Sequence, residues 1–564
     1  MRSLRPHSPN TKSLPVDTQQ LLVSSVSWPS RISLSRALTW GRLLSVFFPL
    51  CYGIFGVLAG KDTSWDLLNY HWYNPYAFLA DRLDFDLAVG HHATYFNPSL
   101  DIPLYLVGEH LPPPLTGFLL ACSQGLNFPL LFWLAWTLFS DLTPGRRFAL
   151  SAVTSIAGMS GAGVLNELAG CAHDNITSIG VLASILVIVL HLQTLIIGRC
   201  WAAAGWVGLA GILAGVTAGL KLTTATYALG LGAALLFVPA SLPRLILLAF
   251  SFGAGGVLGL SLGAGFWMHR LWEFSGSPFF PYFNDLFHSP LLLNASYRDT
   301  TFIPQELVTR LLFPFYFSAN SFLVAEWHFR DVRILMVFVT LPCCAIWALA
   351  RKAGKTWPAS HWIDPTPSRF LAMAAAISYA AWLWMFCIYR YLLPLEMLAP
   401  LLIAVALGWL PLSNRARTTT LVALLVLSQS LVQINFAGRK PWGDHYLEVT
   451  APFISPEEQA MVLMTGYEPM SYVIPYFPPS VPFLRIDGYL AKSDETNGLT
   501  TLMQQRVKEH RGRRYVLFHP SEKESVPKAL LAYGLDFDKL PCRQVSSTVA
   551  EPLELCPVYA LPHL

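Results

Sequence analysis

The sequence predicts a polytopic α-helical membrane protein that carries a small external α/β domain at its C-terminus. Hydrophobic residues make up 54% and charged residues only 13% of the 564 positions, and the mean hydropathy of +0.45 does not describe an ordinary soluble chain. The apolar residues gather in stretches of roughly 20, the length that crosses the hydrocarbon core as a helix. Residues 437–564 lack such stretches and form the predicted external domain.

About eleven apolar stretches make up the predicted membrane domain, residues 37–436. They lie near residues 37–60, 113–139, 148–165, 176–197, 201–220, 222–240, 245–266, 334–350, 370–388, 391–412 and 418–436. The aromatic stretch 307–325 is either a twelfth span or a re-entrant piece.

Basic residues set the predicted orientation, because short loops rich in Lys and Arg stay on the cytoplasmic side. Arginines precede the first span, and alternate loops after it carry the other basic residues. The polar segment 1–36 is then a disordered cytoplasmic tail, whereas the acidic loop 61–112 and the segment 437–564 are external. The net charge of +4 gives no indication of nucleic-acid binding.

Cysteine placement adds one structural prediction. Most of the nine cysteines lie in or beside spans, where a thiol acts as a small apolar filler, and only Cys542 and Cys556 lie in the external segment. An external compartment is oxidising, so we predict a disulfide that closes a loop of ~15 residues, with two unpaired thiols as the alternative. No Cys/His spacing resembles a zinc site, and nothing indicates a nucleotide or haem.

The external segment has the pattern of a small mixed domain. The stretch SPEEQAMVLM, residues 455–464, begins like a helix, because Ser and Pro precede two acids. The stretch RRYVLFHP, residues 513–520, is typical of a strand, and residues 521–534 are typical of a helix. We therefore expect an α/β cap.

The stretch SWDLLNYHWYNPYAFLADRL, residues 64–83, follows directly on the first span. At a period of 3.6 residues, Trp65 and Trp72 fall on one arc, whereas Asp66, Tyr70 and Tyr73 fall on another. This predicts an amphipathic helix, with its first arc against lipid or other spans and its second facing the external space. Asp66 either caps this helix or belongs to a functional site.

Further ionisable residues lie at the outer ends of other spans. They are Glu167, His173 and Asp174 between the third and fourth spans, Lys221 at the next outer turn, Arg390 at another, and Glu396 inside or near the tenth span. Each has a local explanation, such as helix capping, snorkelling or pairing of Arg390 with Glu396. Together on one face they favour a site, because ionisable groups at such depth are costly. The aromatic loop 267–290, which contains Arg270, suits either a substrate groove or a packing element.

Several short motifs accompany these clusters. They are the acid and amphipathic helix after the first span, the Glu/Asp pair near the third and fourth spans, GLKLT (219–223), GSPFFPYFN (276–284), RYLLP (390–394) and the external C-terminal domain. In this organisation the chain resembles integral-membrane GT-C glycosyltransferases, notably protein O-mannosyltransferases and lipid A aminoarabinose transferases. Many of these have two adjacent acids in the first loop, whereas the stretch SWDLL (64–68) supplies only Asp66 here.

The resemblance implies that a sugar moves from a polyprenyl-phosphate carrier to an acceptor at the outer face of the membrane, with inversion at the anomeric carbon. A carboxylate takes the proton of the acceptor hydroxyl, and Asp66 is the expected base. Asp62, Glu167 and Asp174 compete for this role. Glu167 and Asp174 otherwise orient the acceptor or sugar, or bind a divalent cation as in some relatives, and the sequence leaves these options open.

Cations at the membrane surface would stabilise the departing phosphate. The expected substrate-binding residues are Arg390 and Lys221, followed by His71 and Arg270, with Tyr70 on the arc of Asp66. The resemblance to bacterial members also implies a bacterial inner membrane, and the partners are a polyprenyl-phosphate-linked sugar and membrane lipid. The sequence does not specify the sugar or the acceptor.

Two other classes of protein also fit a bundle with polar clusters. A secondary transporter places ionisable residues between spans, although it usually shows paired repeats and a site near the midplane. A non-catalytic assembly protein would need no reactive cluster. The position of the clusters at one face favours the transferase.

Overall fold

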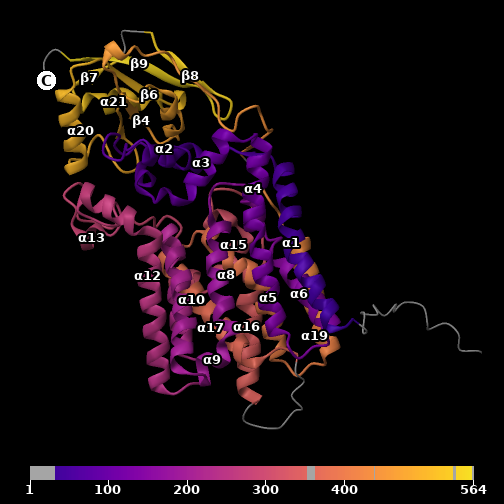
Figure 1. The fold of residues 1–564 in the computed structure, drawn as a ribbon. Coiled ribbons are helices and arrows are strands. Elements are labelled where there is room, and N and C mark those ends of the chain that lie inside the picture. Colours follow the sequence, from indigo (N-terminus) through magenta and orange to yellow (C-terminus); the bar gives the residue numbers. More distant parts are fainter. Residues whose placement is uncertain (1–31, 352–361, 437, 538–540, 562–564) are drawn as a thin grey trace, which may run out of the picture.

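The computed structural model describes residues 32–351, 362–436, 438–537 and 541–561. These residues form a helical bundle with a mixed β-sheet domain at one end (Figure 1). Most of the predicted tail, residues 1–36, lies outside the described residues. The first helix, α1, begins at Leu34, where the hydroxyl of Ser33 accepts a hydrogen bond from the backbone N–H of Arg36.

Six helical segments of the described chain are long and apolar enough to cross a membrane. They are Leu34–Ala59 (α1), Pro113–Leu138 (α4, Pro113–Gly125, and α5, Asn127–Leu138), Cys200–Leu220 (α10), Leu242–Ser275 (α12), Arg333–Ala350 (in α16, Arg333–Arg351) and Tyr389–Gly408 (ending in α18, Leu393–Gly408). Helices satisfy their own backbone hydrogen bonds, which a spanning segment requires in lipid. The fold is therefore that of a helical membrane protein with a small C-terminal sheet domain.

Helices also occupy the other predicted spans, but they are shorter or less apolar. They are α6 (Pro144–Gly158), α8 (Asp174–Leu190) continued by α9 (Leu192–Ile197), α11 (Ala225–Leu235), α17 (Pro365–Met385) and α19 (Asn414–Ser430). The count of about eleven spans stays a prediction. The stretch 307–325 forms short pieces, α14 (Leu307–Leu311) and α15 (Phe313–Ala319), and not one continuous helix.

Residues 64–83 of the first external loop do not form the single amphipathic helix that we predicted. Leu67–His71 form a π-helical turn, Tyr73–Leu79 form α2 and Asp101–His110 form α3. Both α2 and α3 lie between the bundle and the C-terminal domain (Figure 1). Trp72 and Tyr73, from opposite predicted arcs, are 0% and 1% exposed. The prediction that one arc faces open external space is wrong, because the C-terminal domain covers it.

The C-terminal domain is α/β, as predicted. Its strands are β3 (Val449–Thr450), β4 (Met461–Thr465), β5 (Phe483–Asp487), β6 (Arg514–Phe518), β7 (Leu535–Asp536), β8 (Arg543–Ser547) and β9 (Leu553–Ala560). They run in the order β3-β8-β9-β6-β4-β5, with β7 beside β9, and β4 pairs in parallel with β5 and β6. The helices of this domain are α20 (Gly498–Glu509) and α21 (Val526–Leu531).

One predicted element of this domain is wrong. Residues 455–464 form only a three-residue 3₁₀ turn, Pro456–Glu458, before β4 begins at Met461. All five residues of β4 are buried, because the strand lies between β5 and β6. A central strand of this kind is apolar on both faces, so its sequence shows no alternation.

The C-terminal domain is joined to the first external loop by buried polar contacts. Asp86 accepts a hydrogen bond of 2.8 Å from the backbone N–H of Phe483, and Arg82 donates one of 2.7 Å to the carbonyl of Val481. Strand β1 (Lys61–Asp62) also pairs with β2 (Arg439–Lys440). The loop and the domain therefore form a single lid over one end of the bundle.

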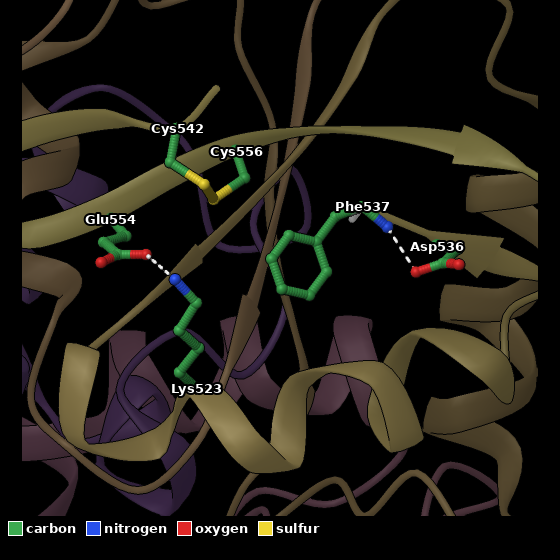
Figure 2. Close-up of a disulfide and its surroundings, with 6 residues drawn as sticks. All are labelled: Lys523, Asp536, Phe537, Cys542, Glu554 and Cys556. Carbon is green, nitrogen blue, oxygen red and sulfur yellow. Dashed lines mark hydrogen bonds and ion pairs between the residues drawn. A yellow bond between two sulfur atoms is a disulfide. The ribbon is translucent and has the colours of Figure 1, made fainter. Parts of the chain in front are cut away.

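The predicted disulfide is present. Cys542 and Cys556 are bonded across the sheet surface, and nearby Lys523 Nζ lies 3.3 Å from Glu554 Oε2 (Figure 2). Both cysteines belong to the part of the chain that the topology prediction makes external.

Candidate functional site

The structure brings together ionisable side chains from five separate segments at the end of the bundle under the lid. We name this group the Asp66 cluster. Its members are Asp66, His71, Asp101, Glu167, His173, Asp174, Lys221 and Arg390. All except Asp101 were singled out from the sequence.

An ion pair joins Asp66 to Arg390, which lies in the turn Tyr389–Leu392 before α18. The side chains of Asp66 and Arg390 retain 16% and 24% exposure, so both remain accessible from outside the protein. Burial opposes ionisation of Asp66, but the positive charges of Arg390 and Lys221 and the hydrogen bond from Arg390 outweigh it and lower the pKa of this carboxyl. Asp66 is therefore ionised at neutral pH. It makes no side-chain capping hydrogen bond to the following turn.

A second ion pair joins Asp174, the first residue of α8, to Lys221, which follows the last residue of α10. The distance from Lys221 Nζ to Asp174 Oδ2 is 2.7 Å. The same ammonium donates a 2.5 Å hydrogen bond to the carbonyl of Ala172, which fixes its position. The sequence-based alternative of a snorkelling lysine does not hold, because Lys221 is bound to a buried carboxylate.

Three further members of the cluster form a hydrogen-bonded trio. Asp101 Oδ1 lies 2.6 Å from His71 Nδ1 and 2.6 Å from His173 Nε2. Burial lowers the pKa of His173, although Asp101 opposes the shift. The nitrogen and oxygen atoms of this trio have the identity and proximity needed to hold a metal ion.

Glu167 lies at the end of the short helix α7 (Ala162–Asn166), and no described group donates a hydrogen bond to either of its carboxylate oxygens. Burial, followed by the negative charge of Asp174, raises the pKa of Glu167 well above its usual range. Its side chain lines a cavity of about 20 Å³ together with Arg390 and Tyr389. A protonated carboxyl here can donate its hydrogen bond to Asp174.

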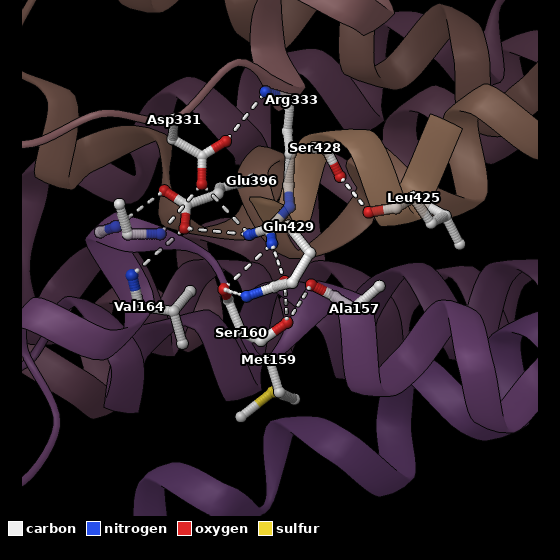
Figure 3. A network of polar contacts seen from close by, with 12 residues as sticks. Ala157, Met159, Ser160, Val164, Asp331, Arg333, Glu396, Leu425, Ser428 and Gln429 are labelled. Atoms are coloured by element: carbon white, nitrogen blue, oxygen red, sulfur yellow. Dashed lines mark hydrogen bonds and ion pairs between the residues drawn. The ribbon is translucent and has the colours of Figure 1, made fainter. Parts of the chain in front are cut away.

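A second group of polar residues, buried except for Gln429, holds α7 in place, and we name it the Arg333 network. Its members are Asp331, Arg333, Glu396 and Gln429 (Figure 3). Glu396 accepts hydrogen bonds of 3.2 and 3.3 Å from the backbone N–H groups of Gly163 and Val164. A Cβ atom at Gly161 would lie 1.6 Å from Glu396 Oε1, so only glycine allows this approach. The alternative in which Arg390 pairs with Glu396 does not hold, since Arg390 pairs with Asp66 and Glu396 with Arg333.

The remaining candidates occupy distinct positions. Tyr70 is buried, and its ring lies 4.0 Å from that of His71, so it packs within the site. Arg270 instead pairs with the exposed Asp81 at 2.5 Å and lines a separate cavity of about 210 Å³. The carboxylate of Asp62 is held in place by the backbone, because it accepts a 2.9 Å hydrogen bond from the N–H of Cys171. Its bond to this backbone group makes it a poor competitor for the role of base.

Asp101 is the member of the cluster to which the sequence assigns no role. It is one of many acids in the first external loop, and its partners lie 30 and 72 residues away. No local spacing signals such an arrangement.

The arrangement combines an accessible ionised carboxylate, two cations and a buried carboxyl of raised pKa at one end of a membrane bundle. Such a site can bind an anionic group through Arg390 and Lys221 and can accept a proton at Asp66. No protein-family model, curated protein or solved structure matches this chain.

Proposed function

We propose that this chain is an integral-membrane glycosyltransferase of the GT-C type. It transfers a sugar from a polyprenyl-phosphate donor to an acceptor at the outer face of a bacterial inner membrane, with the N-terminus cytoplasmic and the C-terminus external. The observation that supports this proposal best is the accessible ion pair of Asp66 and Arg390, with Lys221 in the same cluster. These residues lie far apart in the sequence, and each comes from a motif of the family resemblance.

The first step is donor binding. The donor phosphate is an anion that competes with Asp66 for the guanidinium of Arg390, and Lys221 adds a second positive charge to the site. When Arg390 turns to the phosphate, Asp66 loses the positive charge that lowers its pKa. Donor binding therefore makes Asp66 a stronger base at the moment when a base is needed.

The second step is substitution at the anomeric carbon. The acceptor oxygen forms a bond to this carbon, the bond from the carbon to the phosphate oxygen breaks, and Asp66 takes the hydroxyl proton. The products are the glycosylated acceptor, a polyprenyl phosphate and a protonated Asp66. Arg390 and Lys221 stabilise the charge that develops on the phosphate.

The proposal is tested with full-length protein reconstituted in liposomes with radiolabelled polyprenyl-phosphate sugars and a lipid extract as the acceptor source. Release of the label from the donor, together with its appearance on another molecule, supports transfer. Movement of an intact solute across the liposome membrane would indicate a transporter. Neither activity across a panel of sugars would contradict the proposal and favour a role in assembly.

A further inference from the structure

Positive charge is unevenly distributed in the Asp66 cluster. Asp66 is paired with Arg390, and Asp174 is paired with Lys221. Asp101 is 3% exposed, and within the described part of the chain its side chain contacts two imidazoles but neither a lysine nor an arginine. A carboxylate buried without a full counter-charge is costly, so this position favours a cation.

The three side chains around this position converge from separate segments. His71 ends the π-helical turn, Asp101 begins α3, and His173 precedes α8. The two histidines are 4% and 5% exposed, and His173 adopts the left-handed backbone conformation with φ of 62°. π-helical turns and left-handed non-glycine residues both concentrate at functional sites, because the surrounding structure must stabilise them.

The outer ring nitrogens provide a second observation. His71 Nε2 and His173 Nδ1 are buried and have no hydrogen-bond partner among the described residues. Each ring directs its inner nitrogen, His71 Nδ1 or His173 Nε2, at the same oxygen, Asp101 Oδ1, and one ligand atom from each of the three residues lies within 4.8 Å of the others. The three inner donor atoms therefore already converge, and the unpaired outer nitrogens can carry the ring protons when the inner nitrogens bind a cation.

We propose that His71, Asp101 and His173 form a binding site for a divalent transition metal, with Zn²⁺ as the best match. Two imidazole nitrogens and one carboxylate oxygen are a donor set of three-residue zinc sites, which leave a fourth position open. Mg²⁺ and Ca²⁺ prefer all-oxygen surroundings and fit less well. The site does not use Glu167 or Asp174, the residues that the family resemblance offers for a cation.

Metal binding requires a small rearrangement. The nitrogens lie 2.6 Å from Asp101 Oδ1, which is a hydrogen-bond distance. Ligand atoms around a tetrahedral zinc ion lie about 3.3 Å apart, given bonds of about 2.0–2.1 Å. Each nitrogen therefore moves away from Oδ1 by about 0.7 Å, and its proton shifts to the outer nitrogen of the ring. Cys542, Glu554 and Cys556 also lie close together. They do not form a competing metal site, because the two sulfurs are bonded in the disulfide.

The test measures metal content and does not depend on transferase activity. Untagged full-length protein in detergent is stripped with a chelator, equilibrated with Zn²⁺, desalted and analysed by inductively coupled plasma mass spectrometry. We expect about one zinc ion per chain in the wild type and a loss of most of it in His173→Gln and Asp101→Asn. His191→Gln is the matched control, because His191 stacks on Trp206 outside the trio, and it should retain the metal.

A second readout covers variants that fold poorly. Zn²⁺ should raise the Tm of the wild type and of His191→Gln but not that of His173→Gln, since only a folded site binds the ion. Substitution with Co²⁺ should give the visible spectrum of a tetrahedral site. Equal zinc content in wild type and His173→Gln, with no shift in Tm, would overturn the proposal and identify the trio as a purely hydrogen-bonded unit. That result would leave the transfer assay unaffected, so the two proposals fail independently.

Discussion

The Asp66 cluster and the Arg333 network are both largely buried groups of polar and charged side chains, but they differ in how completely their polar atoms are paired. In the Arg333 network, Asp331 accepts hydrogen bonds from the backbone N–H groups of Arg333 and Ala162, and Arg333 donates to Gln429 at 2.7 Å. Among its described side chains, Arg333 Nε is the atom left without a partner. The Asp66 cluster leaves several such atoms, including His71 Nε2, His173 Nδ1 and Arg390 Nε.

This difference separates a structural role from a functional one. A buried network that satisfies its own atoms stabilises one conformation, in this case that of α7 and the turn before Glu167. A buried cluster with unpaired atoms costs stability, and proteins accept this cost at sites that bind a ligand. Substitutions in the two groups should therefore have opposite effects on stability and activity.

The largest effect is expected for Arg333→Met. This change leaves Asp331 and Glu396 buried without their cation, and breaking a buried ion pair typically costs about 3–5 kcal/mol. Thermal unfolding in detergent should show a large drop in Tm or a loss of folded protein. Arg330→Met is the control, because the side chain of Arg330 is exposed. Equal Tm values for the two variants would show that the network is not structural.

A smaller effect of opposite sign is expected for Glu167→Gln. The pKa of Glu167 is raised in the folded state, so the folded protein binds this proton more tightly than the unfolded chain does. Stability therefore falls as the pH rises from the unfolded pKa of about 4.3 toward the folded pKa. Removing the acid should stabilise the protein by roughly 1 kcal/mol at neutral pH and have no effect at low pH.

The measurement for Glu167→Gln is Tm as a function of pH, with Glu326→Gln as the same substitution at an exposed position. A gain in Tm that is confined to neutral and higher pH supports the account. A loss of Tm at neutral pH would show that ionised Glu167 stabilises the fold, as in the Arg333 network.

The smallest effect is expected for Arg270→Met. Its ion pair with Asp81 is exposed, and exposed pairs contribute about 0–1 kcal/mol. Arg270 also lines a cavity other than that of the cluster. Transfer activity and Tm should both stay close to wild type. A tenfold loss of donor binding in the reconstituted assay would contradict this expectation and show that Arg270 is a substrate-binding residue.

The sequence predicts most of this site because its residues flank apolar stretches. Asp66, Asp174, Lys221 and Arg390 all lie where a helix begins or ends, so hydropathy places them at one face of the membrane. It cannot predict which of them pair. Arg390 prefers Asp66 to the nearby Glu396, because Glu396 is already bound to Arg333 and to backbone N–H groups at the start of α7.

Two errors have one cause, which is packing between distant segments. The C-terminal domain packs against both Trp72 and Tyr73, so their helical pattern says nothing about exposure. In the same way, β4 lies between β5 and β6, and an apolar strand without alternation resembles a buried helix. The trio of His71, Asp101 and His173 is the hardest case for sequence analysis. Its members lie 30 and 72 residues apart along the chain and meet only in the folded protein.

The central claim is that Asp66 is the proton acceptor of a transfer reaction and not a structural partner of Arg390. The most direct measurement is the rate of sugar transfer from a radiolabelled polyprenyl-phosphate donor by Asp66→Asn, alongside Asp81→Asn as an exposed control. Asn retains the size and one acceptor oxygen for Arg390 but cannot take a proton at neutral pH. The account predicts a fall in rate of roughly 10² or more with a near-normal Tm, and wild-type activity for the control. Full activity in folded Asp66→Asn would contradict the account and move the search for the base to Glu167 or Asp174.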